Sequence, residues 1–123
     1  MSGAAHAPVL IVPFRIGQPM PVPRVDVEHE VLRPSLPDGT PQERLGVLCD
    51  AIAARTAANP VRAVYIGDCV LTLGVLAGLQ RRGVAPALIW LDAHGDFNTW
   101  ETTPSGFLGG MPLAMAVGRG EQT

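Results

Sequence analysis

Two aspartates and a histidine follow an apolar run late in the chain. The segment ALIWLDAHGDF, which begins at Ala87, contains Asp92, His94 and Asp96 at intervals of two residues. In an extended segment such residues project from one face, so we expect these three side chains to lie together. Two carboxylates and an imidazole suit Mn²⁺, Zn²⁺ or Fe²⁺ better than Mg²⁺ or Ca²⁺, which prefer oxygen ligands only. The alternative is that Asp92 caps the following turn and His94 is a surface residue.

The elements that would position these residues alternate between strands and helices. Apolar and β-branched runs predict strands, and apolar residues at helical spacing predict helices. Thr40-Pro41-Gln42-Glu43 has the form of a capping box with proline at the first helical position. We expect strands over residues 8–14, 61–66 and 87–91, and helices over 40–58, 69–82 and 109–117.

Apolar strands that alternate with helices predict an α/β fold with a parallel sheet. Six prolines make residues 16–41 a loop with at most an edge strand. Gly74 and Gly78 would let their helix pack closely on the sheet. In parallel sheets, sites form at the carboxyl ends of the strands. Asp68 and Cys69 follow one predicted strand, and Asp92 follows the next, so we expect both groups at one edge.

Composition limits the classes of function. The chain has 123 residues, 47% hydrophobic and 16% charged, which predicts one globular domain over residues 1–123. A net charge of −2 provides no basic surface for nucleic acid. The longest apolar run, residues 70–79, is too short to span a membrane. Two cysteines and an N-terminus without the features of a signal peptide favour a cytoplasmic location.

Several of these segments resemble the arginase/agmatinase (ureohydrolase) family. The specific part is LDAHGDFNT, followed by TPSGFLGGMPLAMAVG, which matches the family's Asp-Ala-His-x-Asp segment, its Asn and its Ser-Gly. YIGDCV at 65–70 is similar to the family's Gly-Gly-Asp-His strand end. VPFRIGQP at 12–19 is similar to its opening strand and turn.

The resemblance implies a fold, a reaction and a set of site residues. The fold would be the N-terminal portion of a three-layer α/β/α sandwich, incomplete in this chain. The reaction would be metal-dependent hydrolysis of C–N bonds in guanidino or amidino compounds. Asp92 would bridge two Mn²⁺ ions, His94 and Asp96 would each bind one, and Asp96 is also the candidate catalytic residue. Asn98 and Ser105 would contact the substrate. We expect a small-molecule substrate, a homo-oligomer, and neither a nucleic acid nor a membrane as partner.

The chain also departs from the family pattern. Cys69 stands where the family has its first histidine ligand, and a thiolate would favour Zn²⁺ over Mn²⁺; the alternative is an inert buried thiol. Gly109 replaces a histidine thought to shuttle protons, and Phe107 replaces a polar residue that helps to hold the amino-acid end of arginine. Both changes argue against arginine as the substrate.

No Asp-x-Asp, the family's second ligand cluster, follows Asp96 in this sequence. Three hypotheses therefore remain open. The chain is the first part of a binuclear metal hydrolase, a non-catalytic homologue that acts as a binding or assembly subunit, or a fragment of the fold without a function of its own.

Overall fold

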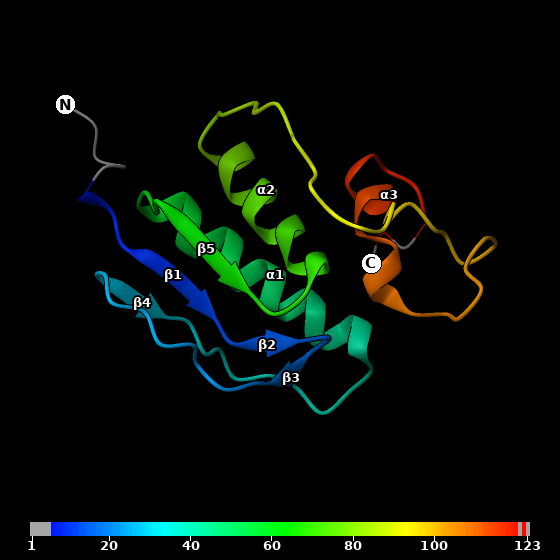
Figure 1. The fold of residues 1–123 in the computed structure, drawn as a ribbon, viewed down its shortest axis with the longest axis horizontal. Helices are drawn as coiled ribbons and strands as arrows, with labels where there is room; N and C mark the ends of the chain where they lie inside the picture. Colours follow the sequence, from blue (N-terminus) through cyan, green and yellow to red (C-terminus); the bar gives the residue numbers. More distant parts are fainter. Residues whose placement is uncertain (1–5, 121, 123) are drawn as a thin grey trace.

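A parallel three-stranded sheet forms the centre of the molecule. The computed structural model describes residues 6–120 and 122. The N-terminal segment that we expect to lack a signal peptide therefore lies partly outside the described residues. β1 (Val9–Val12) lies between β4 (His29–Val31) and β5 (Ala63–Ile66), and it is parallel to both (Figure 1). The predicted α/β fold with a parallel sheet is confirmed.

The central position of β1 follows from its side chains. Leu10, Ile11 and Val12 are all completely buried, as expected for a strand covered on both faces. Immediately after β1, β2 (Phe14–Arg15) and β3 (Gln18–Pro19) form a short antiparallel hairpin. The proline-rich segment therefore contributes only short strands, with β4 at an edge of the sheet, in agreement with the prediction.

The first helix, α1 (Pro41–Ala58), begins as its sequence predicts. The amide of Glu43 donates to Oγ1 of Thr40 at 3.2 Å, and the amide of Thr40 donates to Oε2 of Glu43 at 2.7 Å. This capping box satisfies two backbone donors that would otherwise have no intrahelical partner. Leu48 and Ile52 are fully buried, so this face of α1 packs into the core.

The second helix packs more closely on α1 than on the sheet. A 3₁₀ turn, η2 (Cys69–Leu71), leads into α2 (Thr72–Arg81). A Cβ atom at Gly78 would lie 1.7 Å from Oγ1 of Thr56, and one at Gly74 would lie 2.8 Å from the carbonyl oxygen of Cys49. The two glycines thus allow close packing against α1, whereas the sequence had suggested the sheet.

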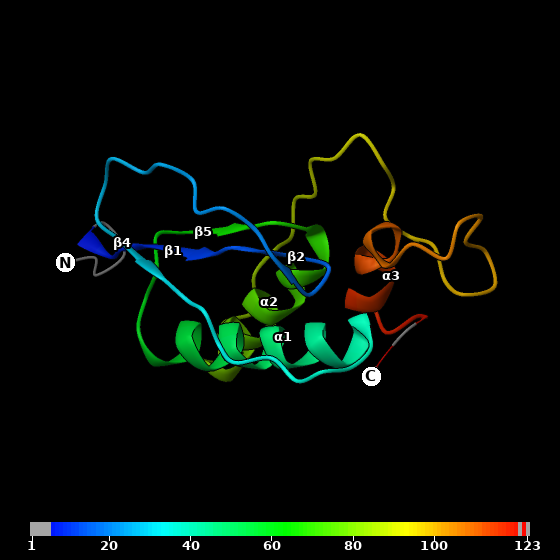
Figure 2. The ribbon, with the colours of Figure 1, turned by 90° about the horizontal axis from the view of Figure 1, so that it is seen from below.

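The helices α1 and α2 lie on one side of the sheet, and residues 20–28 arch over the opposite side (Figure 2). The described residues form one helical layer and the sheet, as expected for an incomplete sandwich. The last expected helix is divided into a 3₁₀ turn, η3 (Leu108–Gly110), and α3 (Pro112–Ala116). Pro112 occupies the first position of α3, where its missing N–H does no harm.

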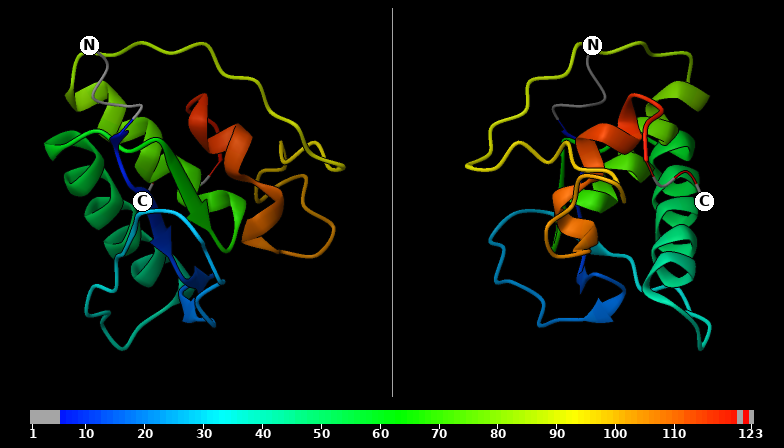
Figure 3. Two further views of the ribbon diagram at one scale, coloured as in Figure 1. Left: turned by 60° about the vertical axis from the view of Figure 1, so that its left-hand side comes forward. Right: turned by 90° about the vertical axis from the view of Figure 1, so that its right-hand side faces the viewer.

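The predicted strand at residues 87–91 does not form. These residues are extended and unpaired, and they lie along a long segment that runs from the end of α2 toward α3 (Figures 1 and 3). Ile89 is 81% exposed and Leu91 is 93% exposed. A strand requires a hydrogen-bonded neighbour. An open cavity of about 420 Å³, lined by the end of β5 and by residues 88–92, lies where pairing would have to occur. Strand propensity alone therefore does not place this segment in the sheet.

Candidate metal centre

Three potential metal ligands converge from two segments of the chain. Cys69 is the first residue of η2, just beyond β5, and Asp92 and Asp96 follow the unpaired segment. Sγ of Cys69 and one carboxylate oxygen from each aspartate lie within 4.8 Å of one another. The thiol also donates to Oδ2 of Asp92 at 3.5 Å. One sulfur and two oxygen donors at this separation could bind a single divalent cation of borderline type, such as Zn²⁺.

His94 contacts one of these three donors, Asp92, but is not part of the three-donor cluster. Its side chain is 84% exposed, and Nδ1 is 3.3 Å from Oδ1 of Asp92. The amide of His94 donates to the same oxygen at 2.9 Å, so Asp92 closes a turn over residues 92–94. The backbone bends at residues 93 and 94 and is not extended there, but the His94 ring still lies against Asp92. The capping role of Asp92 is present alongside its contact with Cys69.

Asp96 is the most firmly held of the three ligands. It is 5% exposed and adopts a left-handed backbone conformation with φ of 52°. Nε1 of Trp90 donates to Oδ2 of Asp96 at 3.1 Å. Trp90 is not among the site residues predicted from the sequence. The sequence did contain a signal for this residue. Trp90 lies two residues before Asp92, and side chains two residues apart project from the same face of an extended segment.

Asp68, which we expected to face the cluster, is used for structure instead. Its Oδ2 accepts from the amide of Ile16 at 2.7 Å, and its Oδ1 accepts from the amide of Val70 at 2.9 Å. Burial raises the pKa of Asp68 despite these hydrogen bonds. The side chain therefore joins the hairpin of β2 and β3 to the start of η2, which fixes the neighbouring Cys69.

The acidic groups of the cluster influence one another's pKa values. Burial, then the hydrogen bond to Asp92, raises the pKa of Cys69 to about 11. Burial and the proximity of Asp92 also raise the pKa of Asp96. The amide of His94 is the main cause of the lowered pKa of Asp92. Closely spaced acidic groups of this kind have the electrostatic character of a cation site.

The two predicted substrate ligands lie in the loop that precedes α3. Oδ1 of Asn98 accepts from Oγ1 of Thr102 at 3.2 Å, and Oγ of Ser105 accepts from the amide of Phe107 at 3.4 Å. The ring of Phe107 lies against Gly109, where an added Cβ would be 2.3 Å from the ring atom Cε2. The two departures from the family pattern in this loop are thus direct neighbours.

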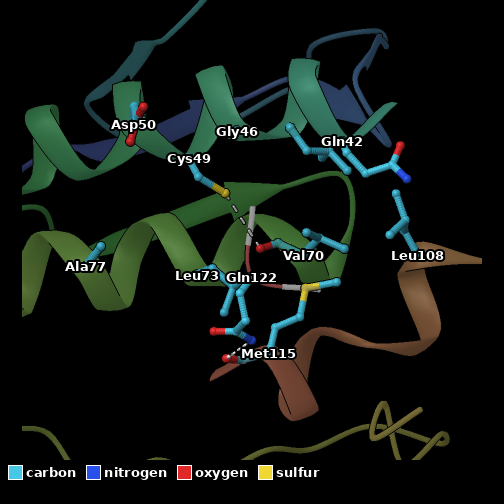
Figure 4. Close-up of a pocket in the computed structure, with 11 residues that line it drawn as sticks. Gln42, Gly46, Cys49, Asp50, Val70, Leu73, Ala77, Leu108, Met115 and Gln122 are labelled. Atoms are coloured by element: carbon cyan, nitrogen blue, oxygen red, sulfur yellow. Dashed lines mark hydrogen bonds between the residues drawn. The ribbon is translucent and has the colours of Figure 1, made fainter. Parts of the chain in front are cut away.

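A separate cavity of about 250 Å³ lies between α1, α2 and α3 (Figure 4). Cys49 points toward it, and its Sγ donates to the carbonyl oxygen of Val70 at 3.9 Å. Burial raises the pKa of Cys49 to about 11. This half-buried thiol stays protonated at neutral pH and packs between α1 and η2.

Residues 25–122 match the arginase family. The chain belongs to the arginase family. An arginase of Bacillus caldovelox is 50% identical over 78 residues, which cover 63% of this chain and 25% of the relative. The arginase of Bacillus subtilis (strain 168) is 47% identical over 57 residues, which cover 46% of this chain and 19% of the relative.

A third relative is named for a different activity. The N(omega)-hydroxy-L-arginine amidinohydrolase of Streptomyces lavendulae is 31% identical over 98 residues, which cover 80% of this chain and 34% of the relative. This arginase-family chain therefore spans about a fifth to a third of the length of these curated relatives. No solved structure matches it. Among the described residues, no helix is long and apolar enough to span a membrane.

Proposed function

We propose that this arginase-family chain provides part of the metal centre of a hydrolase that cleaves C–N bonds in guanidino or amidino compounds. The observation that carries the proposal is the convergence of Cys69, Asp92 and Asp96 within 4.8 Å. Membership of the arginase family supports the proposal, and so do the names of the relatives, arginase and N(omega)-hydroxy-L-arginine amidinohydrolase.

Each residue has a proposed role. Cys69, Asp92 and Asp96 would bind the cation, and their negative charges would compensate its positive charge. Nδ1 of His94 lies 3.3 Å from Oδ1 of Asp92. A rotation of the His94 side chain would bring its imidazole to the cation as a further ligand. A bound ion would act as a Lewis acid and lower the pKa of a water molecule. Asp96, as the proposed catalytic residue, would orient the attacking water through its carboxylate.

The proposed metal is Mn²⁺, as implied by the family resemblance, with Zn²⁺ favoured to the extent that Cys69 is a ligand. The proposed substrate is a guanidino or amidino compound other than arginine. Asn98 and Ser105 would contact it, while Phe107 places an apolar ring against Gly109 in the same loop. We further propose a cytoplasmic homo-oligomer.

A non-catalytic binding or assembly subunit is the second candidate. The observation that favours it is the exposure of His94 outside the three-donor cluster. Metal binding separates the two candidates, because an assembly subunit does not require it.

The experiment is metal analysis followed by an assay. The purified protein is loaded with Mn²⁺ or Zn²⁺, dialysed, and tested for bound metal and for urea or ammonia release from a panel of guanidino compounds. Asp92→Asn should reduce the bound metal, whereas Asp26→Asn is the control, since the Asp26 side chain is 83% exposed in the loop before β4. Equal metal content in wild type and Asp92→Asn would reject the proposed centre.

A further inference from the structure

Trp90 donates a side-chain hydrogen bond to Asp96 from outside the cluster of Cys69, Asp92 and Asp96. Nε1 of the indole lies 3.1 Å from Oδ2 of Asp96, and both residues are partly or fully removed from solvent. An indole N–H is a donor only, so this contact depends on an acceptor oxygen and limits rotation of the carboxylate. One of the two oxygens of Asp96 is thereby fixed.

The backbone of Asp96 is held independently of its side chain. Its carbonyl oxygen accepts from the amide of Leu113 at 2.9 Å and from the amide of Ala114 at 3.3 Å, both in α3. The left-handed φ of 52° is unfavourable for an aspartate, so the surrounding contacts must maintain it. Asp96 therefore has a defined position and orientation relative to α3.

The segment that carries Asp92 has much less support. Residues 87–91 form no strand, and Leu91, immediately before Asp92, is 93% exposed. Trp90 lies in this segment, two residues before Asp92, and its bond to Asp96 joins the unpaired segment to the residue anchored on α3. The same hydrogen bond thus orients one ligand and limits the distance to the other.

We propose that Trp90 is a positioning residue for the metal centre, which fixes the Asp96 carboxylate and its separation from Asp92 before a cation binds. The inference rests on the proposed function, because it concerns the same cluster. Residues that hydrogen-bond to metal ligands typically contribute 10- to 100-fold to metal affinity. Trp90 is suited to this role because it is a rigid side chain with a single donor.

The test compares Trp90→Phe with Trp100→Phe, which removes the other indole of the chain as a matched control. Zn²⁺ and Co²⁺ are titrated by calorimetry, and the absorption spectrum of the Co²⁺-loaded protein reports the coordination geometry. Trp90→Phe should weaken binding by about 10- to 100-fold and alter the Co²⁺ spectrum. Trp100→Phe should leave both unchanged. A role in packing alone would change the unfolding temperature without changing the spectrum, and that result would overturn the proposal.

The remaining outcomes distinguish failure of the proposed metal centre from failure of the proposed role of Trp90. If wild type binds neither ion, the metal centre and the role of Trp90 both fail. If wild type binds and Trp90→Phe binds equally well, only the role of Trp90 fails. If Trp90→Phe does not fold, the Trp100→Phe protein has Trp90 as its sole indole. Its fluorescence should change on Zn²⁺ addition with the midpoint found by calorimetry, and an unchanged emission would overturn the proposal.

Discussion

Sγ of Cys69 lies 3.5 Å from Oδ2 of Asp92, although 23 residues separate them in the sequence. The intervening chain forms α2 and the unpaired segment, so this contact joins the region after β5 to the end of the unpaired segment. It also places the residue that departs from the family's ligand pattern directly in the proposed metal centre.

Substitution of Cys69 should change metal selectivity. Cys69→Ser should weaken Zn²⁺ binding in particular, because it removes the soft thiolate ligand. Cys69→His should shift the preference toward Mn²⁺, because imidazole and carboxylate donors suit that ion. Calorimetric titration of both ions into wild type and the two variants measures this, with Cys49→Ser as the control thiol. Unchanged affinities in both Cys69 variants would identify Cys69 as an inert thiol.

The 123-residue chain by itself should not hydrolyse guanidino compounds. Among the described residues three donors converge, and the sequence contains no Asp-x-Asp after Asp96 to complete a second metal position. Two adjacent cations would lack sufficient negative charge and a fixed geometry. A urea and ammonia assay on the Mn²⁺-loaded chain checks this. Release that disappears in Asp92→Asn would show that the chain is catalytically sufficient.

Glu30 and Arg55 should contribute a small, pH-dependent stabilisation. Nε and Nη2 of Arg55 donate to the carboxylate of Glu30 at 2.7 and 2.5 Å, which joins β4 to α1. The hydrogen bond from Arg55 lowers the pKa of Glu30 below its usual 4.5. The stabilisation is therefore present above pH 4.5 and is lost as the pH falls through the lowered value.

The Glu30 side chain is 44% exposed, so we expect Glu30→Gln to cost only about 0.5 kcal/mol at pH 7. Urea unfolding of wild type and variant at pH 7 and at pH 3 measures the difference, with Glu28→Gln as the control. The two proteins should converge in stability at the lower pH. A difference that persists or grows at pH 3 would contradict the assigned role.

Gly78→Ala should destabilise the packing of α2 on α1. The new methyl group would lie 1.7 Å from Oγ1 of Thr56, whose hydroxyl donates to the carbonyl oxygen of Ile52 at 2.8 Å. Because Thr56 is buried and β-branched, the helices must separate, at a cost of about 1–3 kcal/mol. Thermal unfolding measures the loss.

Gly46→Ala is the matched control, because no atom lies within 4 Å of a Cβ at that position in α1. There the same substitution should stabilise the protein by about 0.5–1 kcal/mol through helix propensity. Equal effects at Gly46 and Gly78 would show that close helix packing at Gly78 is not required.

The sequence by itself determined the local elements and the residue types of the site. The capping box at Thr40 and Glu43, the buried strand β1 and the helix after Asp68 all depend on short-range patterns, and all form as predicted. The chemistry of Cys69, Asp92 and Asp96 was also visible, because donor types and strand-end positions are properties of the sequence.

Only the tertiary structure decided how these residues meet. Residues 87–91 have strand propensity, but a strand depends on a paired neighbour, and the described chain provides none beside them. The turn closed by Asp92 leaves the His94 side chain exposed and in contact with Asp92 alone among the three donors, and the anchored Asp96 accepts a hydrogen bond from the indole N–H of Trp90. These outcomes depend on hydrogen bonds and packing between segments far apart in the chain. The two-residue spacing of Asp92, His94 and Asp96 cannot specify such contacts.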